Sequence, residues 1–252
     1  MKLASIINVW ADCVELLPFC IKNHLEFCDN VIAVWSQNSN HFVKNDAVLE
    51  YIVANGHDSR VEFVQLEPVK GLKPLANETR KRNHGIDIAY LKGFTHFLVA
   101  DADEFYHPEE MERDKKRFDN QGLNGLVSPL IVYVGKPTLW CEDHTLVPTI
   151  HKLTKDAYTG SFKEYPFAYT GQVARIDPSR RPNFLKGIET SDTKCHHFSY
   201  VRKDIDLKID NSSANLKNSR EAIKQHIKNA APGYKSGYGI LKECPNYFNI
   251  VI

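Results

Sequence analysis

Four short apolar runs dominate the first hundred residues, and longer segments with polar and apolar side chains separate them. Runs of this length, bounded by polar turns, are typical of buried strands. Strands that alternate with helices through short connections form mostly parallel sheets that are covered on both faces. The sequence therefore predicts an α/β fold with a mostly parallel central sheet. The expected strands are residues 3–9, 31–35, 61–66 and 96–100.

Helices are expected between these strands. Apolar side chains recur at helical spacing after Asp12, although Pro18 would delay the start of that helix or bend it. A second helix is expected over residues 42–54. A third is expected to begin at Asn77, its cap, and to end at Gly93.

The second half of the chain is less regular. Residues 126–134 have the pattern of a long strand, and a polar helix is expected over residues 215–230. The segment 135–194 combines turn residues and aromatic side chains without a clear period, which is typical of functional loops or a small sheet. No repeat or linker divides the chain, so we expect a single domain over residues 1–252.

The composition excludes several classes of protein. The 32 Lys+Arg and 31 Asp+Glu leave a net charge of +1, which argues against a protein that grips nucleic acid over its whole surface. No window approaches the run of about 18 apolar residues that crosses a membrane, and the apolar start of the chain is too short for a signal peptide. Six cysteines occur without a CxxC pair, which is typical of reduced thiols. We therefore expect a cytoplasmic protein without a membrane span.

An acidic cluster follows the fourth expected strand directly. Asp101, Asp103 and Glu104 occupy three of four positions, and their mutual repulsion requires compensation. Mg²⁺ and Mn²⁺ prefer oxygen ligands and are commonly held by one or two carboxylates together with substrate phosphates. Alternation at a strand end would turn Asp101 and Asp103 toward one ion or one sugar. A second interpretation places the acids at the start of a helix near Pro108, where negative charge is favoured.

Three segments resemble one family of enzymes. Residues 77–105, NETRKRNHGIDIAYLKGFTHFLVADADEF, are similar to the donor-site core of GT-A glycosyltransferases of the family 2-like group. That group carries an Arg-Asn-x-Gly helix, here residues 82–85, followed by a strand and a DxD motif. Residues 11–39 resemble the opening of the group, and residues 197–202, HFSYVR, resemble its carboxyl-terminal segment. The resemblance covers residues 3–105 and 194–210.

The resemblance implies a fold and an activity. The fold is a GT-A, Rossmann-like sheet with an irregular carboxyl-terminal acceptor region. Residues 1–120 would bind a nucleotide-diphosphate sugar, and residues 121–252 would bind the acceptor and supply a metal ligand. The activity is transfer of the sugar to a hydroxyl group, with Mn²⁺ or Mg²⁺ stabilising the charge on the departing phosphate.

The resemblance also implies a set of metal ligands. Asp103 would be the main ligand, and Asp101 would be shared between the metal shell and hydroxyls of the donor. His197 would close over the ion from the carboxyl-terminal segment. Its neighbour His196 should face the other way if that segment is extended.

Other side chains of the matched segments are candidates for contacts with the donor. Charge-assisted bonds to phosphate suit Arg80, Arg82 and Arg202. Asn83 belongs to the matched helix and would bind the donor or shape the packing of that helix. The family usually has an acidic residue after the second strand, where this chain has Trp35 followed by amides, so Trp35 is a candidate contact to the base. We expect a UDP-sugar as donor, with other bases left open.

An inverting transfer needs a carboxylate that takes the proton of the acceptor hydroxyl. The candidates form two pairs in the second half of the chain. Glu142 and Asp143 lie beside an aromatic residue, and Glu189 and Asp192 come just before the histidines. The aromatic neighbour favours Asp143. If neither pair serves, a retaining mechanism is open.

The acceptor and the reaction class leave alternatives. Two basic clusters, residues 115–117 and Arg180-Arg181 with Lys186, are either solvated surface or phosphate contacts of a nucleic-acid acceptor. The expected acceptor is a glycan precursor or, as the second choice, a hydroxymethyl base in phage-type DNA. A nucleotide-sugar hydrolase, a nucleotidyltransferase of related fold and a non-catalytic binding module stay open. The nucleotidyltransferase is disfavoured because residues 9–13 lack the glycine-rich loop it would need.

Overall fold

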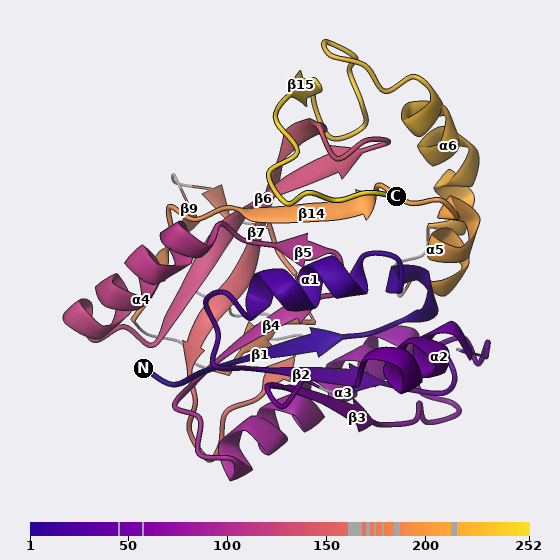
Figure 1. Ribbon diagram of the computed structural model, residues 1–252. Helices are drawn as coiled ribbons and strands as arrows, with labels where there is room; N and C mark the ends of the chain where they lie inside the picture. Colours follow the sequence, from indigo (N-terminus) through magenta and orange to yellow (C-terminus); the bar gives the residue numbers. More distant parts are fainter. Residues whose placement is uncertain are drawn as a thin grey trace.

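The computed structural model describes the chain apart from residues 45, 57, 161–167, 170–171, 174, 178, 184–186 and 213–215. Its main feature is a large mixed sheet that runs through both halves of the chain, with helices on both faces (Figure 1). The strand order along the sheet is β3-β2-β1-β4-β7-β6-β14-β5, and β11, β13 and β15 pair with strands of this path.

Four parallel strands form the first part of the sheet. β1 (Leu3–Asn8) lies between β2 (Asn30–Trp35) and β4 (His96–Asp101), and β3 (Val61–Gln65) pairs with the outer edge of β2. All four were predicted from the sequence, and all six residues of β1 are buried. The expected α/β fold with a mostly parallel sheet is thus confirmed. The parallel arrangement brings the carboxyl ends of β1 and β4 side by side.

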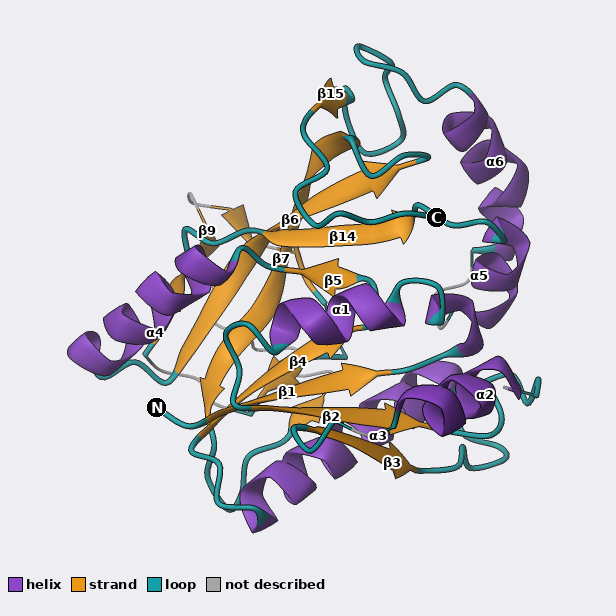
Figure 2. Cartoon of the chain, viewed as in Figure 1, coloured by secondary structure: helices purple, strands orange, loops and turns teal. Residues whose placement is uncertain are grey.

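Alternate residues of β1 contact helices on opposite faces of the sheet. Ala4 and Ile6 belong to the cluster formed with α3 (Pro74–Leu91), whereas Ile7 belongs to the cluster formed with α1 (Leu17–His24). This is the period of two that a strand imposes on its side chains. The sheet is therefore covered on both faces, as Figure 2 shows.

Gly85 allows α3 to lie close to the sheet. A Cβ atom at this position would be 2.4 Å from Cγ2 of Ile6 and 3.1 Å from Cγ2 of Val34. Any larger residue would push the helix off the sheet. The Arg-Asn-x-Gly segment therefore has a packing function at its glycine.

A long hairpin builds the second part of the sheet. β6 (Gly125–Val134) pairs antiparallel with β7 (Leu139–Lys152), and β7 also pairs antiparallel with β4. β14 (Cys195–Tyr200) returns parallel to β6, and the short β5 (Glu104–Phe105) pairs antiparallel with β14. This arrangement carries the carboxyl-terminal histidines to the acidic turn that follows β4.

The expectation of an irregular segment over residues 135–194 is wrong for β7. The amino-terminal part of β7 alternates between buried and more exposed residues, and residues 146–151 are all buried. The polar residues Glu142, Asp143 and His144 do not have the pattern of a buried strand, because their side chains are partly or fully exposed. The rest of the segment contains only short strands in the part of the chain that the structure describes. They are β8 (Thr159–Gly160), β9 (Ala168–Tyr169), β10 (Gln172–Val173), β11 (Arg175–Ile176), β12 (Arg181–Pro182) and β13 (Ile188–Thr190).

The third helix starts earlier than expected. It begins at Pro74, where a missing N–H costs nothing, and Asn77 lies inside its first turn. The Asn77 side chain instead accepts a hydrogen bond from the Val69 N–H (2.9 Å) and donates one to the Val69 carbonyl (3.2 Å). The Asn77 side chain therefore stabilises the loop before the helix and does not cap the helix.

The remaining helices lie around the sheet. The acids Glu109 and Glu110 occupy the first turn of α4, whereas Asp101 and Asp103 precede it, so the helix start does not explain the whole acidic cluster. The polar helix expected over 215–230 corresponds to the shorter α6 (Arg220–Lys228), and α5 (Ile205–Asn211) precedes it. The other elements are η1 (Ala11–Cys13), α2 (Asp46–Asn55), α4 (Pro108–Gln121), α5 (Ile205–Asn211), η2 (Lys217–Ser219), α6 (Arg220–Lys228) and β15 (Lys242–Glu243).

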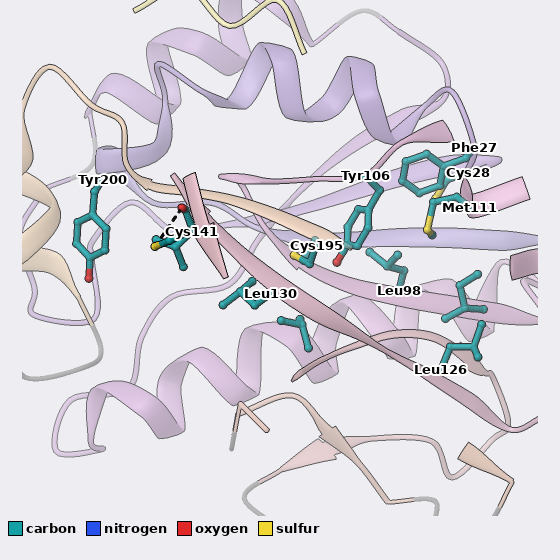
Figure 3. Close-up of a cluster of buried hydrophobic side chains, with 14 of the residues drawn as sticks. Phe27, Cys28, Leu98, Tyr106, Met111, Leu126, Leu130, Cys141, Cys195 and Tyr200 are labelled. Carbon is teal, nitrogen blue, oxygen red and sulfur yellow. Dashed lines mark hydrogen bonds between the residues drawn. The ribbon is translucent and has the colours of Figure 1, made fainter. Parts of the chain in front are cut away.

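The largest buried cluster joins the two parts of the sheet. It contains Leu98 of β4, Leu130 of β6, Tyr106 after β5 and Cys195 of β14 (Figure 3). Burial of this apolar surface fixes β14 beside β6 and so fixes its histidines. Among the residues described, no helix is both long and apolar enough to cross a membrane.

Candidate functional site

A cleft of about 650 Å³ opens at the carboxyl ends of β1 and β4. Ligands of open α/β sheets bind at this edge. The cleft is lined by side chains from both halves of the chain, including Trp10 after β1, Asp101 at the end of β4, His197 of β14 and Lys208 of α5.

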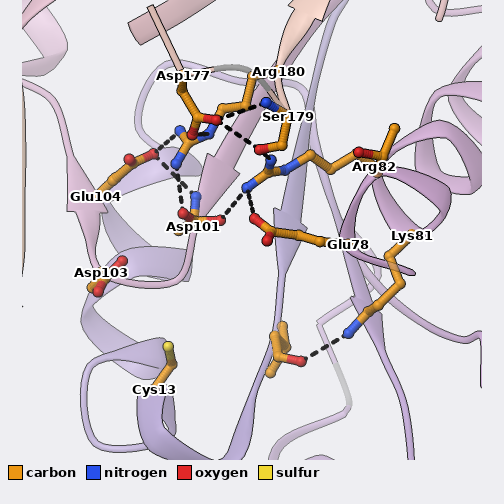
Figure 4. A network of polar contacts seen from close by, with 12 residues as sticks. Cys13, Glu78, Lys81, Arg82, Asp101, Asp103, Glu104, Asp177, Ser179 and Arg180 are labelled. Carbon is orange, nitrogen blue, oxygen red and sulfur yellow. Dashed lines mark hydrogen bonds and ion pairs between the residues drawn. The ribbon is translucent and has the colours of Figure 1, made fainter. Parts of the chain in front are cut away.

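Asp101 is engaged by two arginines. Its Oδ1 accepts a hydrogen bond from Arg82 (2.9 Å), and its Oδ2 accepts one from Arg180 (2.5 Å) (Figure 4). Burial alone would raise the pKa of Asp101, but the guanidinium groups of Arg180 and Arg82 outweigh it and hold the pKa below its usual value. Both carboxylate oxygens of Asp101 therefore have strong partners inside the protein.

The two arginines are themselves buried in a larger ionic network. The Arg82 side chain is fully buried and also contacts Glu78 (2.5 Å) and Ser179. Arg180 also pairs with Glu104 (2.6 Å) and with Asp177 (2.9 Å). This network ties α3, the turn after β4 and the segment before β12 together. The side chains act as structural supports for the floor of the cleft.

Asp103 has different surroundings. Its fully buried carboxylate has Oδ2 bonded to Arg202 and to Lys208 (3.2 Å). Its Oδ1 lies 3.5 Å from Nε2 of His197 and has no hydrogen-bond partner among the described residues. Burial opposes ionisation, but Lys208, His197 and Arg202 hold the pKa of Asp103 well below its usual value. Burial would likewise lower the pKa of His197, and Asp103 raises it above its usual value.

Asp101 and Asp103 were expected to turn toward one ion, but in the structure their carboxylates contact different side chains. β4 ends at Asp101, and residues 102–103 form a turn, so strand alternation no longer fixes the direction of Asp103. Asp103 lies outside the Asp101 network in Figure 4. Each aspartate has its own set of cations.

Asp103 and His197 suit a divalent cation better than Asp101 does. A buried carboxylate oxygen without a hydrogen bond is costly, and an imidazole nitrogen lies beside it. Asp101 has no carboxylate oxygen free of an arginine. The described residues bring no group of three His, Cys, Asp or Glu side chains together, so phosphate or water oxygens would have to complete the shell. The Mn²⁺ or Mg²⁺ expectation stays a prediction.

The predicted donor contacts fall into two groups. Arg82 and Arg202 are fully buried, and Arg202 is also held by the backbone carbonyls of Ser199 (3.0 Å) and Asp12. Arg80 contacts the Glu67 carbonyl (3.4 Å) and does not line the cleft in the described part of the chain. Arg82 and Arg202 therefore support the site from behind its surface.

Asn83 ties α3 to β8. Its Oδ1 accepts hydrogen bonds from the Thr159 N–H (2.8 Å) and hydroxyl (3.1 Å), and its Nδ2 donates to the Thr159 carbonyl (3.0 Å). All of these contacts are structural, which is the packing alternative considered for this residue.

Trp35, the predicted contact to the base, is not among the described residues that line the cleft. Trp35 is 8% exposed and belongs to a buried cluster, because it is still part of β2. Trp10 lines the cleft instead. The Lys81 ammonium lies 3.6 Å from the centre of the Trp10 ring and donates to the Val9 carbonyl (3.0 Å). Burial lowers the pKa of Lys81 to about 7.

The candidate bases are spread over the molecule. Asp143 accepts a hydrogen bond from the N–H of Thr145 (2.8 Å), and Thr145 lines the cleft, so Asp143 lies beside its rim. Glu142 is exposed near Lys242 (3.8 Å), and Glu189 pairs with Arg117. Among these four carboxylates, the structure brings Asp143 alone next to a cleft-lining residue.

Asp192 lies in a different pocket. This pocket of about 330 Å³ is also lined by His196 and Tyr133. Nδ1 of His196 is hydrogen-bonded to the Tyr133 hydroxyl (2.8 Å). His196 and His197 thus face different cavities, as expected for neighbours on an extended strand.

The members of the two basic clusters that the structure describes have different surroundings. Lys115 donates to the Phe27 carbonyl (2.9 Å), and Arg117 pairs with Glu189. Arg180 is buried, Arg181 lines the cleft, and Lys186 lies outside the described residues.

Sequence comparisons give no assignment, since no family model matches the chain and a search of curated proteins finds no match. Among solved structures, residues 1–349 of S. aureus TarS in complex with UDP-GlcNAc are 19% identical, with a TM-score of 0.40 over 54% of this chain and 36% of that chain. TarS 1–349 alone is 17% identical, with a TM-score of 0.44 over 91% of this chain and 66% of that chain. CMP:2-keto-3-deoxy-manno-octonic acid synthetase with CTP is 10% identical, with a TM-score of 0.36 over 55% of this chain and 58% of that chain. The chain thus spans 36% to 66% of these TarS 1–349 chains, and its function has to rest on the site.

Proposed function

We propose that this chain is a glycosyltransferase that moves a sugar from a nucleotide-diphosphate sugar to a hydroxyl acceptor. The observation that carries the proposal is the pairing of the Asp103 carboxylate with His197 beside a 650 Å³ cleft at the carboxyl ends of parallel strands. A buried carboxylate oxygen that lacks a hydrogen bond among the described residues suits a ligand that arrives with the substrate.

The part of the cleft proposed for the donor contains the Trp10 ring and lies next to the pair of Asp103 and His197. Trp10 offers an aromatic face for the base, and the ammonium of Lys81 orients that ring. Asp103 and His197 would hold Mn²⁺ or Mg²⁺, which would act as a Lewis acid on the departing diphosphate. We take UDP as the first nucleotide to test.

The acceptor half of the cleft supplies the proton acceptor in this proposal. For an inverting transfer, Asp143 would take the proton of the acceptor hydroxyl while the oxygen–carbon bond forms and the sugar–phosphate bond breaks. Asp143 is proposed because it lies beside cleft-lining Thr145. A glycan precursor is the proposed acceptor, and a hydroxymethyl base in DNA is the second choice.

The test is calorimetry with a panel of nucleotide sugars that includes UDP-GlcNAc. Each donor is measured with Mn²⁺, with Mg²⁺ and with chelator, on the wild type and on Asp103→Ala. Metal-dependent binding of one donor that the variant loses supports the proposal. If no nucleotide sugar binds under any condition, the proposal fails. Incubation of the binding donor with and without candidate acceptors then separates transfer from hydrolysis.

A further inference from the structure

We propose that Lys208 is the side chain that binds the diphosphate of the donor, and that Asp103 and Asp12 hold its ammonium group when no donor is present. The inference rests on the proposed function and names a residue outside the segments first considered for phosphate binding. In chemical terms, the ligand of Lys208 is the β-phosphate of a nucleoside diphosphate.

The position of Lys208 brings its charge to the cleft. It belongs to α5, and its side chain is 16% exposed where it lines the cleft. Nζ lies 3.2 Å from Oδ2 of Asp103 and 3.6 Å from Oδ2 of Asp12. Lys208 thus joins the carboxylate of the acidic turn to the open space in which a substrate would lie.

Lys208 can change partners, whereas the neighbouring arginines are held in place. Arg202 has no exposed side-chain surface and bonds the carbonyls of Ser199 and Asp12 as well as Asp103. Arg181, the other cation that lines the cleft in the described residues, donates to the Ile176 carbonyl (2.8 Å). A lysine ammonium is a compact charge on a flexible stem, and its donors can turn to a new acceptor.

The charges around Asp103 favour such an exchange. Beside the cleft, the carboxylates of Asp12 and Asp103 flank the Lys208 ammonium, and Arg202 and His197 also lie next to Asp103. Arg202 remains on Asp103 if Lys208 leaves, so Asp103 is not stranded as an unpaired buried charge. A diphosphate brings about two further negative charges, and its oxygens are strong acceptors for an ammonium group. Movement of Nζ from the carboxylates to the phosphate therefore places a cation where the leaving group develops charge.

The test compares UDP with UMP, which lacks the β-phosphate. Affinities are measured by calorimetry for the wild type, Lys208→Met and Lys208→Arg, each with Mn²⁺ and with chelator. The control is Lys203→Met, because Lys203 lies on the same segment and its side chain is exposed. We expect Lys208→Met to weaken UDP by about ten- to hundredfold, the value of one charge-assisted hydrogen bond, and to change UMP by less than about threefold. Lys208→Arg should recover part of the loss, and Lys203→Met should bind UDP as the wild type does.

The outcomes separate the two proposals. Retained UMP binding shows that the variant is folded, so a selective loss of UDP supports the role of Lys208. Unchanged UDP affinity in Lys208→Met, or an equal loss of UDP and UMP, overturns it while the proposed function stands. The nucleotide pair is that of the donor selected by the nucleotide-sugar panel, UDP and UMP being the first choice. If no nucleotide sugar of the panel binds the wild type, the proposed function fails first and this inference fails with it.

Discussion

Asp101 and Asp103 are two residues apart in one acidic turn, yet they lie in opposite kinds of environment. Asp101 has an arginine on each carboxylate oxygen, and both arginines are buried in a network with further acids. Asp103 has its cations on one oxygen, while the other faces His197 without a hydrogen bond in the described residues. Asp101 thus lines the cleft with both carboxylate oxygens paired, whereas Asp103 is fully buried beside the cleft-lining His197 and keeps one oxygen that no hydrogen bond satisfies among the described residues.

The difference shows that two aspartates of one short motif can have separate roles. A carboxylate with complete partners stabilises the elements that supply them, here α3 and the segment that contains Arg180. A buried oxygen without a hydrogen bond is a cost that folding alone does not repay. Repeated acids at a strand end need therefore not share one ion.

The largest expected effect comes from Asp103→Asn. Loss of the charge at Asp103 should lower kcat/KM for the transfer by about a thousandfold, since several kcal/mol of charge stabilisation in the transition state depend on this site. The measurement is steady-state turnover with the donor identified by calorimetry. Asp101→Asn is the matched variant, and its main loss should be in stability. Retention of more than about a tenth of wild-type turnover by Asp103→Asn would contradict the division between the two aspartates.

The scaffold side of the comparison is tested by Arg180→Met. This change leaves Asp101, Glu104 and Asp177 without the guanidinium that they share. Removal of one partner from a buried ionic network should lower the free energy of unfolding by about 4 kcal/mol. Urea titration measures it, and Arg113→Met is the control, since its side chain is 70% exposed and should change stability by less than about 0.5 kcal/mol. A loss below about 1 kcal/mol for Arg180→Met would show that the network is not structural.

Much of the fold could be predicted from local patterns in the sequence. The apolar runs that form β1, β2, β3 and β4 fixed the parallel part of the sheet, and Pro18 delayed α1 as expected. The site was harder, because its charges are paired through space. Arg180 comes from a segment without periodicity, and Lys208 lies inside the matched stretch 194–210 but outside its HFSYVR motif, so the sequence did not link either residue to the acidic turn.

Two differences between the sequence-based expectations and the structure have a common physical cause. Trp35 was predicted as a contact to the base from its place at the end of the second apolar run, but such a residue can be either the last buried member of a strand or the first exposed one. The pairing of Trp35 with Gln65 in the neighbouring strand keeps it in the sheet, whereas β1 already ends at Asn8. The polar stretch in β7 was missed for the same reason, since burial by the rest of the sheet decides where a strand ends.

Acid should weaken the contact between His24 and the acidic turn, which is made at the Glu104 carbonyl. Nε2 of His24 donates a hydrogen bond to the Glu104 carbonyl (3.0 Å), and in the neutral ring Nδ1 accepts one from the Ser5 hydroxyl (2.7 Å). Burial lowers the pKa of His24 from 6.5 to about 4. The unfolded chain therefore takes up the proton first, so the stability from the neutral ring is complete above pH 6.5 and is lost as the pH falls toward 4.

The corresponding measurement is the free energy of unfolding of wild type and His24→Gln across this range. Between neutral pH and about pH 4.5 the wild type should lose about 2–3 kcal/mol more than the variant, because glutamine does not titrate. Other groups that titrate are common to both proteins and cancel in the difference. Parallel pH profiles for the two proteins would show that His24 does not carry the effect.

The smallest expected effect distinguishes the two tryptophans. Trp10→Leu should weaken UDP binding by about tenfold, because a base stacked on an aromatic ring is stabilised by about 1–3 kcal/mol, and the fold should be nearly unchanged. Trp35→Leu should lower the melting temperature and leave the affinity for UDP within about twofold, since Trp35 is 8% exposed inside a buried cluster. Calorimetry and thermal unfolding of both variants make the comparison. If Trp35→Leu loses UDP while Trp10→Leu keeps it, the donor lies at the edge of β2, and the cleft beside Asp103 is not the nucleotide site.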